Sequence, residues 1–165
     1  MKRIGLFVLT VVLAGCAMNQ GPPSDGQSAG KGACKPISEQ EVAALFDRWN
    51  QSLQTGDPKK VVANYAERSI LLPTVSNTPR LTPEQKEEYF EEFLKNRPSG
   101  QIDPRTRFIE LGCNSAVDAG LYTFTYNTTG KKVCARYTYT YSWNGRAWLI
   151  TSHHSSVMPE PAPCE

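Results

Sequence analysis

The sequence has few of the groups that hold metal ions and nucleotides. It contains two histidines, His153 and His154, and neighbouring positions on a strand point to opposite faces, so the pair cannot chelate one ion together. No spacing of His with Cys or carboxylates typical of a zinc or iron site accompanies them. The Gly-x-Gly-x-x-Gly fingerprint of dinucleotide-binding proteins is also missing. We therefore expect neither a metal ion nor another cofactor.

The chain also lacks a strong excess of charge of one sign. Its 18 basic and 16 acidic side chains leave a formal net charge of +2. Removal of residues 1–15 as a signal peptide would take away Lys2 and Arg3 and bring that charge to zero. Without a basic excess a protein does not hold nucleic acid by charge, and we expect no nucleic-acid partner.

The one long apolar run is at the amino terminus. Lys2 and Arg3 precede the apolar stretch 4–13, which is too short to span a bilayer stably and has the pattern of a secretory signal. The run 13–16, Leu-Ala-Gly-Cys, resembles the lipobox of bacterial lipoproteins. That resemblance implies acylation of the Cys16 thiol and cleavage before it; a plain signal peptide or an uncleaved anchor is the alternative.

The resemblance also implies a location. The protein would be exported and held on a membrane through the lipid on Cys16. Ala17 follows Cys16, where an Asp would resemble the inner-membrane retention signal. In a two-membrane bacterium we therefore expect the outer membrane, with the protein facing the periplasm. Residues 16–35 are rich in Gly, Ser and Pro and should be the flexible tether of one domain at 36–160, followed by a tail at 161–165.

The count of five cysteines is odd, and lipidation of Cys16 explains it. Four cysteines then remain in an exported chain, and disulfides are the expected outcome: Cys34, Cys113, Cys134 and Cys164. Sequence alone allows three connectivities, and free buried thiols are a further alternative. We favour Cys34–Cys113 with Cys134–Cys164, because the strand order expected below separates Cys113 from Cys134 along the sheet.

Three helices are expected before most of the strands. Ser38 and Glu41 form a capping box that opens a helix ending at Gly56, and Asp57 caps a second helix that starts at Pro58. A second capping box opens a third helix at residues 82–85, and residues 97–100 should close it.

Strands dominate the rest of the chain. A short strand is expected at 70–73, and a meander follows residue 102, with strands at 107–114, 117–126, 132–143 and 146–157. Asn144-Gly145 favours a two-residue type I′ hairpin. Helices followed by an antiparallel meander indicate an α+β fold, with three N-terminal helices packed on a strongly curved, mostly antiparallel sheet.

This order of elements resembles the cone-shaped nuclear-transport-factor-2-like (SnoaL-like) fold. The run 152–160, Ser-His-His-Ser-Ser-Val-Met-Pro-Glu, follows an Asn-Gly turn and Trp148. Together with 72–80, Leu-Pro-Thr-Val-Ser-Asn-Thr-Pro-Arg, it resembles the SgcJ/EcaC-type relatives of the calcium/calmodulin-dependent kinase II association domain. The resemblance implies a pocket at the open end of the cone. Relatives use that pocket for isomerase, hydratase or cyclase catalysis, for ligand capture, or only as a gap in an assembly.

Arg136 is the strongest candidate for a binding residue. It interrupts an apolar strand on the same face as Thr138, and the related association domain carries arginines in its own pocket. We expect it to bind a small carboxylate or an acidic peptide tail; a salt bridge to Asp118 is the alternative. One of the two histidines should face the same pocket. The predicted ligand-binding set is completed by Tyr65, Tyr89, His153 and Ser155.

The aromatic row in the third meander strand predicts packing. Tyr137, Tyr139, Tyr141 and Trp143 share one face of that strand. They should pack against a helix, or against a second subunit in a homodimer or larger homo-oligomer.

Two functions remain open on this evidence. The first is a membrane-tethered module that self-associates and binds an acidic ligand without catalysis. The second is a small-molecule isomerase or cyclase that uses Tyr65, Asp118 or His153 for proton transfer. A carboxyl group of raised pKa beside a tyrosine in the pocket would favour the enzyme.

Overall fold

The computed structural model describes residues 34–160. The predicted signal peptide, the lipidated Cys16, most of the tether and the tail lie outside the described residues. The elements are α1 (Glu39–Leu53), α2 (Pro58–Val62), β1 (Tyr65–Leu72), α3 (Pro83–Leu94), β2 (Pro98–Ile102), β3 (Phe108–Gly112), β4 (Ser115–Tyr126), β5 (Lys131–Trp143) and β6 (Trp148–Val157). This order confirms the predicted α+β class.

Local side-chain bonds start all three helices where the sequence predicts. The Ser38 hydroxyl accepts from the backbone N–H of Glu41 at 3.2 Å, and the Glu41 carboxylate accepts from the N–H of Ser38 at 2.8 Å. Thr82 and Gln85 form the same reciprocal box at α3. Asp57 caps α2 by accepting from the Lys59 N–H at 3.0 Å. Each box satisfies backbone donors that the first helical turn would otherwise leave unpaired.

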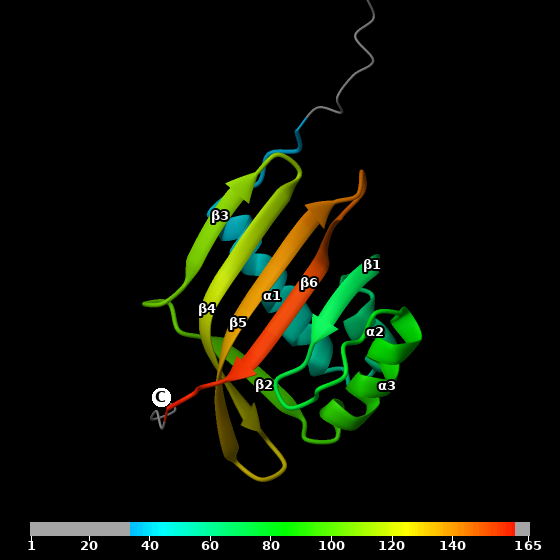
Figure 1. The fold of residues 1–165 in the computed structure, drawn as a ribbon, viewed down its shortest axis with the longest axis vertical. Coiled ribbons are helices and arrows are strands. Elements are labelled where there is room, and N and C mark those ends of the chain that lie inside the picture. Colours follow the sequence, from blue (N-terminus) through cyan, green and yellow to red (C-terminus); the bar gives the residue numbers. More distant parts are fainter. Residues whose placement is uncertain (1–33, 161–165) are drawn as a thin grey trace, which may run out of the picture. The chain divides into compact units, whose positions relative to one another are not determined.

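The strands form one sheet in the order β1-β6-β5-β4-β2, with β3 also paired to β4. β1 runs parallel to β6 and the other pairs are antiparallel, which confirms the mostly antiparallel prediction. The long β4 pairs with β3 over its first half and with β2 over its second half. α1 lies across one face of the sheet, and α2 and α3 lie near the β1 edge (Figure 1).

Three local predictions differ from the structure. Residues 98–102 form β2 on the edge of β4 rather than only closing α3, and Pro98 stands at the first position of that strand, where no ladder donor is required. β1 begins at Tyr65, earlier than the short strand expected at 70–73. The β5–β6 connection is a four-residue loop, because the Asn144 amide oxygen accepts from the N–H groups of Arg146 and Ala147.

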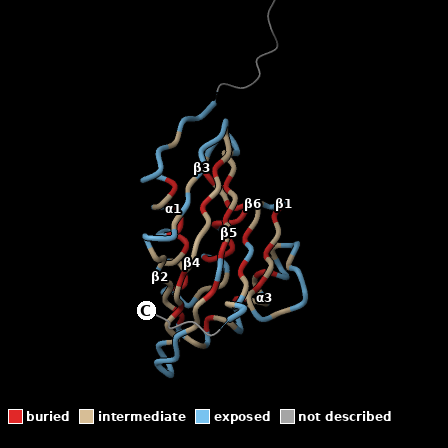
Figure 2. Tube along the Cα trace, turned by 60° about the vertical axis from the view of Figure 1, so that its left-hand side comes forward, coloured by how far each residue is buried: buried red, intermediate tan, exposed pale blue. Residues whose placement is uncertain are grey.

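The aromatic row of β5 packs against α1. The ring centroid of Tyr139 lies 6.0 Å from that of Phe46 and 5.7 Å from that of Trp49, and Tyr137, Tyr139 and Tyr141 are all buried. Buried positions recur along β4, β5 and β6 in Figure 2. These three tyrosines therefore belong to the sheet-on-helix core.

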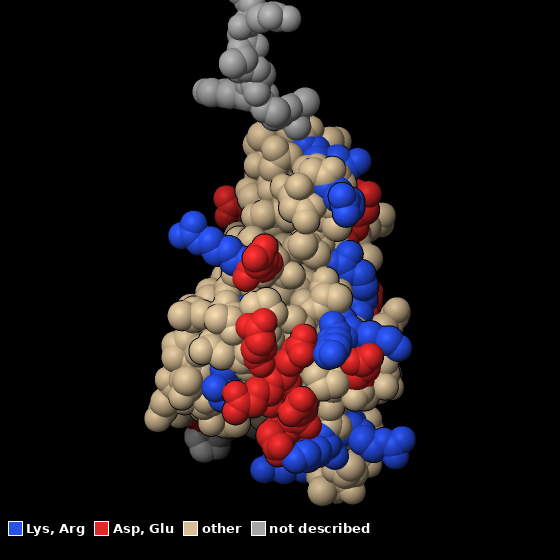
Figure 3. All heavy atoms as spheres, turned by 90° about the vertical axis from the view of Figure 1, so that its right-hand side faces the viewer, with Lys and Arg blue, Asp and Glu red and all other residues tan. Residues whose placement is uncertain are grey.

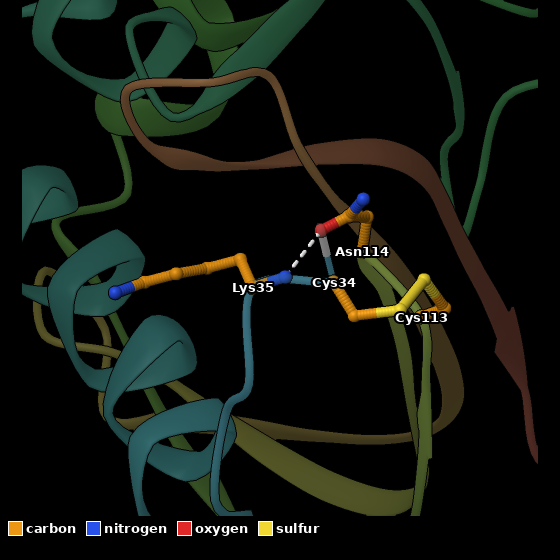
Figure 4. The surroundings of a disulfide bond; sticks show 4 residues. All are labelled: Cys34, Lys35, Cys113 and Asn114. Carbon is orange, nitrogen blue, oxygen red and sulfur yellow. Dashed lines mark hydrogen bonds between the residues drawn. A yellow bond between two sulfur atoms is a disulfide. The ribbon is translucent and has the colours of Figure 1, made fainter. Parts of the chain in front are cut away.

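A disulfide ties the start of the described chain to the β3–β4 hairpin. Cys34 and Cys113 are bonded across a sequence separation of 79 (Figure 4). Beside the bond, the Lys35 N–H donates to the Asn114 side-chain oxygen at 2.7 Å. Asn114 has φ of 59°, the left-handed conformation that Asn tolerates in tight hairpins. This is the first of the two predicted pairs; Cys164 lies outside the described residues, and the second pair stays a prediction.

Candidate functional site

A cavity of about 300 Å³ lies between α3 and the inner face of the sheet. Its wall is largely aromatic and includes Trp49, Tyr89, Phe90, Phe93, Tyr122, Phe124 and Tyr126. Thr74, Arg80, His153 and Ser155 supply polar groups. A few polar groups in a mostly apolar pocket are typical of small-molecule sites.

Three hydroxyl groups from distant parts of the chain meet in this cavity. Tyr122 of β4 donates to the Ser155 hydroxyl of β6 at 2.5 Å, and the Ser155 and Thr74 hydroxyls are hydrogen-bonded to each other. Burial raises the pKa of Tyr122, so its phenol keeps its proton at neutral pH. The three groups carry three protons and form two bonds among themselves. One hydroxyl proton, on Thr74 or Ser155, is left over from these two bonds. Because the Thr74 hydroxyl also lies close enough to Tyr122 to lower the pKa of that phenol, this proton can turn either to Tyr122 or to a ligand.

His153 lines the same cavity. Its Nδ1 lies 2.8 Å from the Tyr65 hydroxyl, and its ring stacks on Tyr139 with centroids 4.1 Å apart. Burial lowers the pKa of His153 to about 3, and the neighbouring His154 adds to the effect. The imidazole is therefore neutral at physiological pH. Its Nε2 is buried and has no hydrogen-bond partner among residues 34–160.

The alternation of β6 brings His153 and Ser155 to the inner face. His153 is paired with Tyr139 and Ser155 with Tyr137, both of which point towards α1. His154, between them, is exposed on the outer face. Of the predicted ligand-binding residues, Tyr89, His153 and Ser155 line the cavity, and Tyr65 contacts it through His153.

Arg136 and Thr138 do not lie in the cavity. Arg136 is exposed on the outer face, where its Nε donates to the Ser156 hydroxyl at 3.1 Å. The predicted alternation of β5 is right, but the tyrosine face turns inward, so the Arg136 face must turn outward. The placement of Arg136 and Thr138 in the pocket was therefore wrong.

Arg80 is the arginine of the cavity. Its backbone pairs with Leu71, and its guanidinium carbon lies 6.0 Å from the centre of the Tyr89 ring. Its Nε is buried without a hydrogen-bond partner within the described part of the chain. Sequence reasoning missed Arg80, Thr74 and Tyr122 as site residues. Thr74 and Arg80 both stand in the 72–80 run that carried the family resemblance.

Asp118 belongs to the core. Its carboxylate accepts from Arg107 Nε at 3.1 Å and Nη2 at 2.6 Å, and from the Tyr137 hydroxyl at 2.9 Å. The side chain is fully buried and is not among the described residues that line the cavity. Its partner is Arg107, so the alternative of a bridge to Arg136 was wrong. A role for Asp118 in proton transfer to a bound molecule is thus unsupported.

The rim of the cavity is acidic. α3 carries Glu84, Glu87, Glu88, Glu91 and Glu92, and Figure 3 shows acidic side chains gathered on the face that carries this helix. Glu88 and Glu92 also line the cavity. Carboxylates gathered this closely repel anions of any size at the rim, so an anion held in the cavity depends on the donors inside it.

Two kinds of feature are absent from residues 34–160. In this part of the chain, no group of three or more His, Cys, Asp or Glu side chains is placed to hold a metal ion. Nor does any helix there have the length and apolar character needed to cross a membrane.

Comparisons with known proteins agree with this architecture. A structure described as a calcium/calmodulin dependent protein kinase II association domain from Xanthomonas campestris is 51% identical, covers 76% of this chain and 91% of its own, and has a TM-score of 0.71. The iota-carbonic anhydrase from a cyanobacterium, complexed with bicarbonate, is 20% identical over 76% of this chain and 94% of its own, with a TM-score of 0.66.

More distant structures share the fold alone. An NTF2-like protein with a cystatin-like fold from Novosphingobium aromaticivorans is 10% identical over 74% of this chain and 83% of its own, with a TM-score of 0.62. No curated protein matches the sequence significantly. The sequence profile of the calcium/calmodulin dependent protein kinase II association domain matches residues 38–159. The chain therefore belongs to the calcium/calmodulin dependent protein kinase II association domain family, with its nuclear-transport-factor-2-like cone fold.

Proposed function

We propose that the cavity binds bicarbonate and interconverts it with carbon dioxide. The observation that carries the proposal is the cluster of Tyr122, Ser155 and Thr74 beside His153, since its unused hydroxyl proton and the unpartnered Nε2 suit a small oxyanion. A fold relative that is a carbonic anhydrase was solved with bicarbonate. This supports the choice of oxyanion, and the donors of this chain supply the physical reason.

The reaction joins water to carbon dioxide and yields bicarbonate and a proton. Negative charge grows on a carbon dioxide oxygen as water adds, and preorganised donors in a water-poor site stabilise such charge strongly. The aromatic wall admits the apolar substrate. Glu88 and Glu92 line the cavity and are exposed, so their carboxylates can pass the released proton to solvent.

The isomerase or cyclase alternative has less support. It requires a base that can remove a proton from a weakly acidic C–H bond, and the low pKa of His153 makes its imidazole a very weak base at neutral pH. The water that adds to carbon dioxide becomes strongly acidic as it adds, so a surface carboxylate can accept its proton. The Asp118 carboxylate is bonded to Arg107 and Tyr137. Within the described cavity wall, no carboxyl group is paired with a tyrosine in the manner that reaction needs.

Stopped-flow hydration of carbon dioxide with a pH indicator tests the proposal. Wild-type protein should exceed the buffer rate, and Ser155→Ala should lose roughly 10²-fold, as is typical when an oxyanion donor is deleted. Ser156→Ala is the matched control, because Ser156 lies on the outer face and contacts Arg136.

Binding of ¹³C-bicarbonate, followed by NMR, separates the remaining outcomes. Bicarbonate binding without hydration would replace the enzyme by a non-catalytic ligand-binding module. Neither hydration nor binding by the wild-type protein would overturn the proposal altogether.

We also propose that two copies pair through the outer face of the sheet. Val117, Ala119, Leu121, Thr138 and Thr140 form a half-buried, uncharged strip on this face, and the neighbouring Phe108 is 59% exposed. Glu110 beside Val117 and Arg136 beside Leu121 are the exposed charged residues that flank the strip. A strip of this kind favours burial against a second sheet. Light scattering should give a dimer for the wild type and a monomer for Thr140→Arg. The same mass for both proteins would contradict this interface.

Membrane tethering through Cys16 is a further proposal, supported by the lipobox pattern alone. Cells fed an alkyne-labelled fatty acid should label the wild-type protein and move it to the membrane fraction. Cys16→Ser should abolish both. A labelled Cys16→Ser protein, or an unlabelled wild type, would exclude lipidation at this residue.

A further inference from the structure

We propose that Tyr65 is a positioning residue that holds His153 in the tautomer with its proton on Nε2. In that form His153 is a hydrogen-bond donor to the oxyanion in the cavity. The identity of the oxyanion rests on the proposed function, whereas the tautomer does not.

The direction of the bond between Tyr65 and His153 follows from which donor can reach the cavity. A neutral imidazole has one N–H donor and one acceptor nitrogen, so the 2.8 Å contact allows two arrangements. If Nδ1–H donated to the phenol, the Tyr65 proton would be buried with no acceptor among the described residues. If the phenol donates to Nδ1, its proton is paired and only Nε2–H remains for a ligand. Each arrangement leaves one donor without a protein partner, the Tyr65 O–H in the first and the Nε2–H in the second. Because His153 lines the cavity and Tyr65 does not, only the Nε2–H can be paired by a molecule in the cavity, which favours the second arrangement.

Protonation states agree with this direction. Burial raises the pKa of Tyr65 well above its usual value, so the phenol retains the proton that it donates. The low pKa of His153 keeps the ring neutral, so Nδ1 is free to accept.

The surrounding rings prevent the imidazole from turning over. One face of His153 lies on Tyr139 with an angle of 24° between the ring planes, and Trp49 meets the ring at 83° with centroids 5.3 Å apart. A flip of the ring would exchange Nδ1 for a carbon and break the bond to Tyr65. Nε2 is therefore the nitrogen left to meet a molecule in the cavity that His153 lines.

The two donors then act on one ligand. His153 and Ser155 are two residues apart on the same face of β6, and both line the cavity. The Nε2–H and the unused proton of the hydroxyl cluster can bind two oxygens of a planar carboxylate-like anion. In this arrangement His153 stabilises charge and does not accept a proton.

The tautomer can be measured directly on the wild-type protein. Long-range ¹H–¹⁵N NMR of ¹⁵N-histidine-labelled protein distinguishes a protonated from an unprotonated ring nitrogen. His153 should show Nε2 protonated and Nδ1 unprotonated at neutral pH, with the exposed His154 as the internal reference. An Nδ1–H signal for His153 would overturn the proposal without any variant having to fold.

Tyr65→Phe then tests the positioning role, since it keeps the ring and removes the hydroxyl. The His153 signals should shift to a mixture of tautomers, and carbon dioxide hydration should fall by about tenfold, less than on deletion of an oxyanion donor. Tyr141→Phe is the control, because the Tyr141 hydroxyl is buried without a partner among the described residues and Tyr141 does not line the cavity. An unchanged tautomer in Tyr65→Phe would refute the role of Tyr65. The expected tautomers in a wild-type protein without hydration activity would instead overturn the proposed function alone.

Discussion

Mild acid should destabilise this domain through His153. The side chain is 4% exposed, and burial lowers its pKa to about 3 from the ordinary value of 6.5. As the pH falls below about 6.5, the unfolded chain takes up a proton at this residue while the folded protein does not. The contribution of His153 to stability is therefore complete above pH 6.5 and is lost progressively between pH 6.5 and about 3.

The size of the effect follows from that difference in pKa. Each unit of pH below the unfolded pKa lowers the free energy of unfolding by about 1.4 kcal/mol until the folded protein begins to protonate. At about pH 5 the loss should be about 2 kcal/mol. This is a large share of the roughly 5–15 kcal/mol that stabilises most domains.

Urea unfolding near pH 7.5 and near pH 5 measures the effect in three proteins: the wild type, His153→Gln and His154→Gln. The drop in stability between the two pH values should be about 2 kcal/mol larger in the wild type than in His153→Gln. His154→Gln should behave like the wild type, because His154 is exposed on the opposite face of β6. The carboxylates titrate in the same way in all three proteins, so their contribution is removed when the losses of stability are compared between variants.

Two results would refute this reasoning. Equal drops in all three proteins would mean that the folded and unfolded chains protonate His153 alike. An NMR titration that places the pKa of His153 near 6.5 in the folded protein would contradict its burial as the cause.

Three further changes should alter stability, each measured by urea unfolding. Replacing both Cys34 and Cys113 by Ser removes a crosslink between residues 79 apart in the sequence. The unfolded chain gains entropy, so the free energy of unfolding should fall by about 4.5 kcal/mol. A loss below about 1 kcal/mol would contradict this. Asp118→Asn leaves the guanidinium of Arg107 without its counter-charge and should lower the free energy of unfolding by about 3–5 kcal/mol. The control Asp103→Asn, at the exposed ion pair with Arg105, should lower it by less than about 1 kcal/mol. Equal losses in the two variants would refute this distinction. The buried ammonium of Lys86 donates to the backbone oxygens of Leu81 at 2.9 Å and Ser69 at 3.0 Å. Lys86→Met leaves both oxygens without this donor and should lower the free energy of unfolding by about 2 kcal/mol or more. An unchanged stability would show that these carbonyls find other donors.

Local sequence determined much of the fold. The capping boxes at Ser38 and Thr82 start α1 and α3 through bonds between residues three apart, which need no distant partner. The alternation of tyrosines in β5 likewise depends only on the geometry of a strand. The Asn-Gly pair at 144–145 marked the last hairpin correctly, although the loop is longer than the two residues predicted.

Tertiary structure decided which groups form the site. Alternation separates Arg136 from Tyr137, but only the packing of α1 determines that the tyrosine side is the inside. The same packing hides His153 and exposes His154, which are indistinguishable as neighbours in the sequence. The hydroxyl cluster joins β4, β6 and the segment after β1, so long-range strand pairing had to form before its members met. The sequence by itself thus determined the helices and strands and their periodicity, because these depend on neighbours along the chain. Which strand face is inside, which side chains meet in the site and whether His153 is protonated depend on burial, which only the folded chain defines.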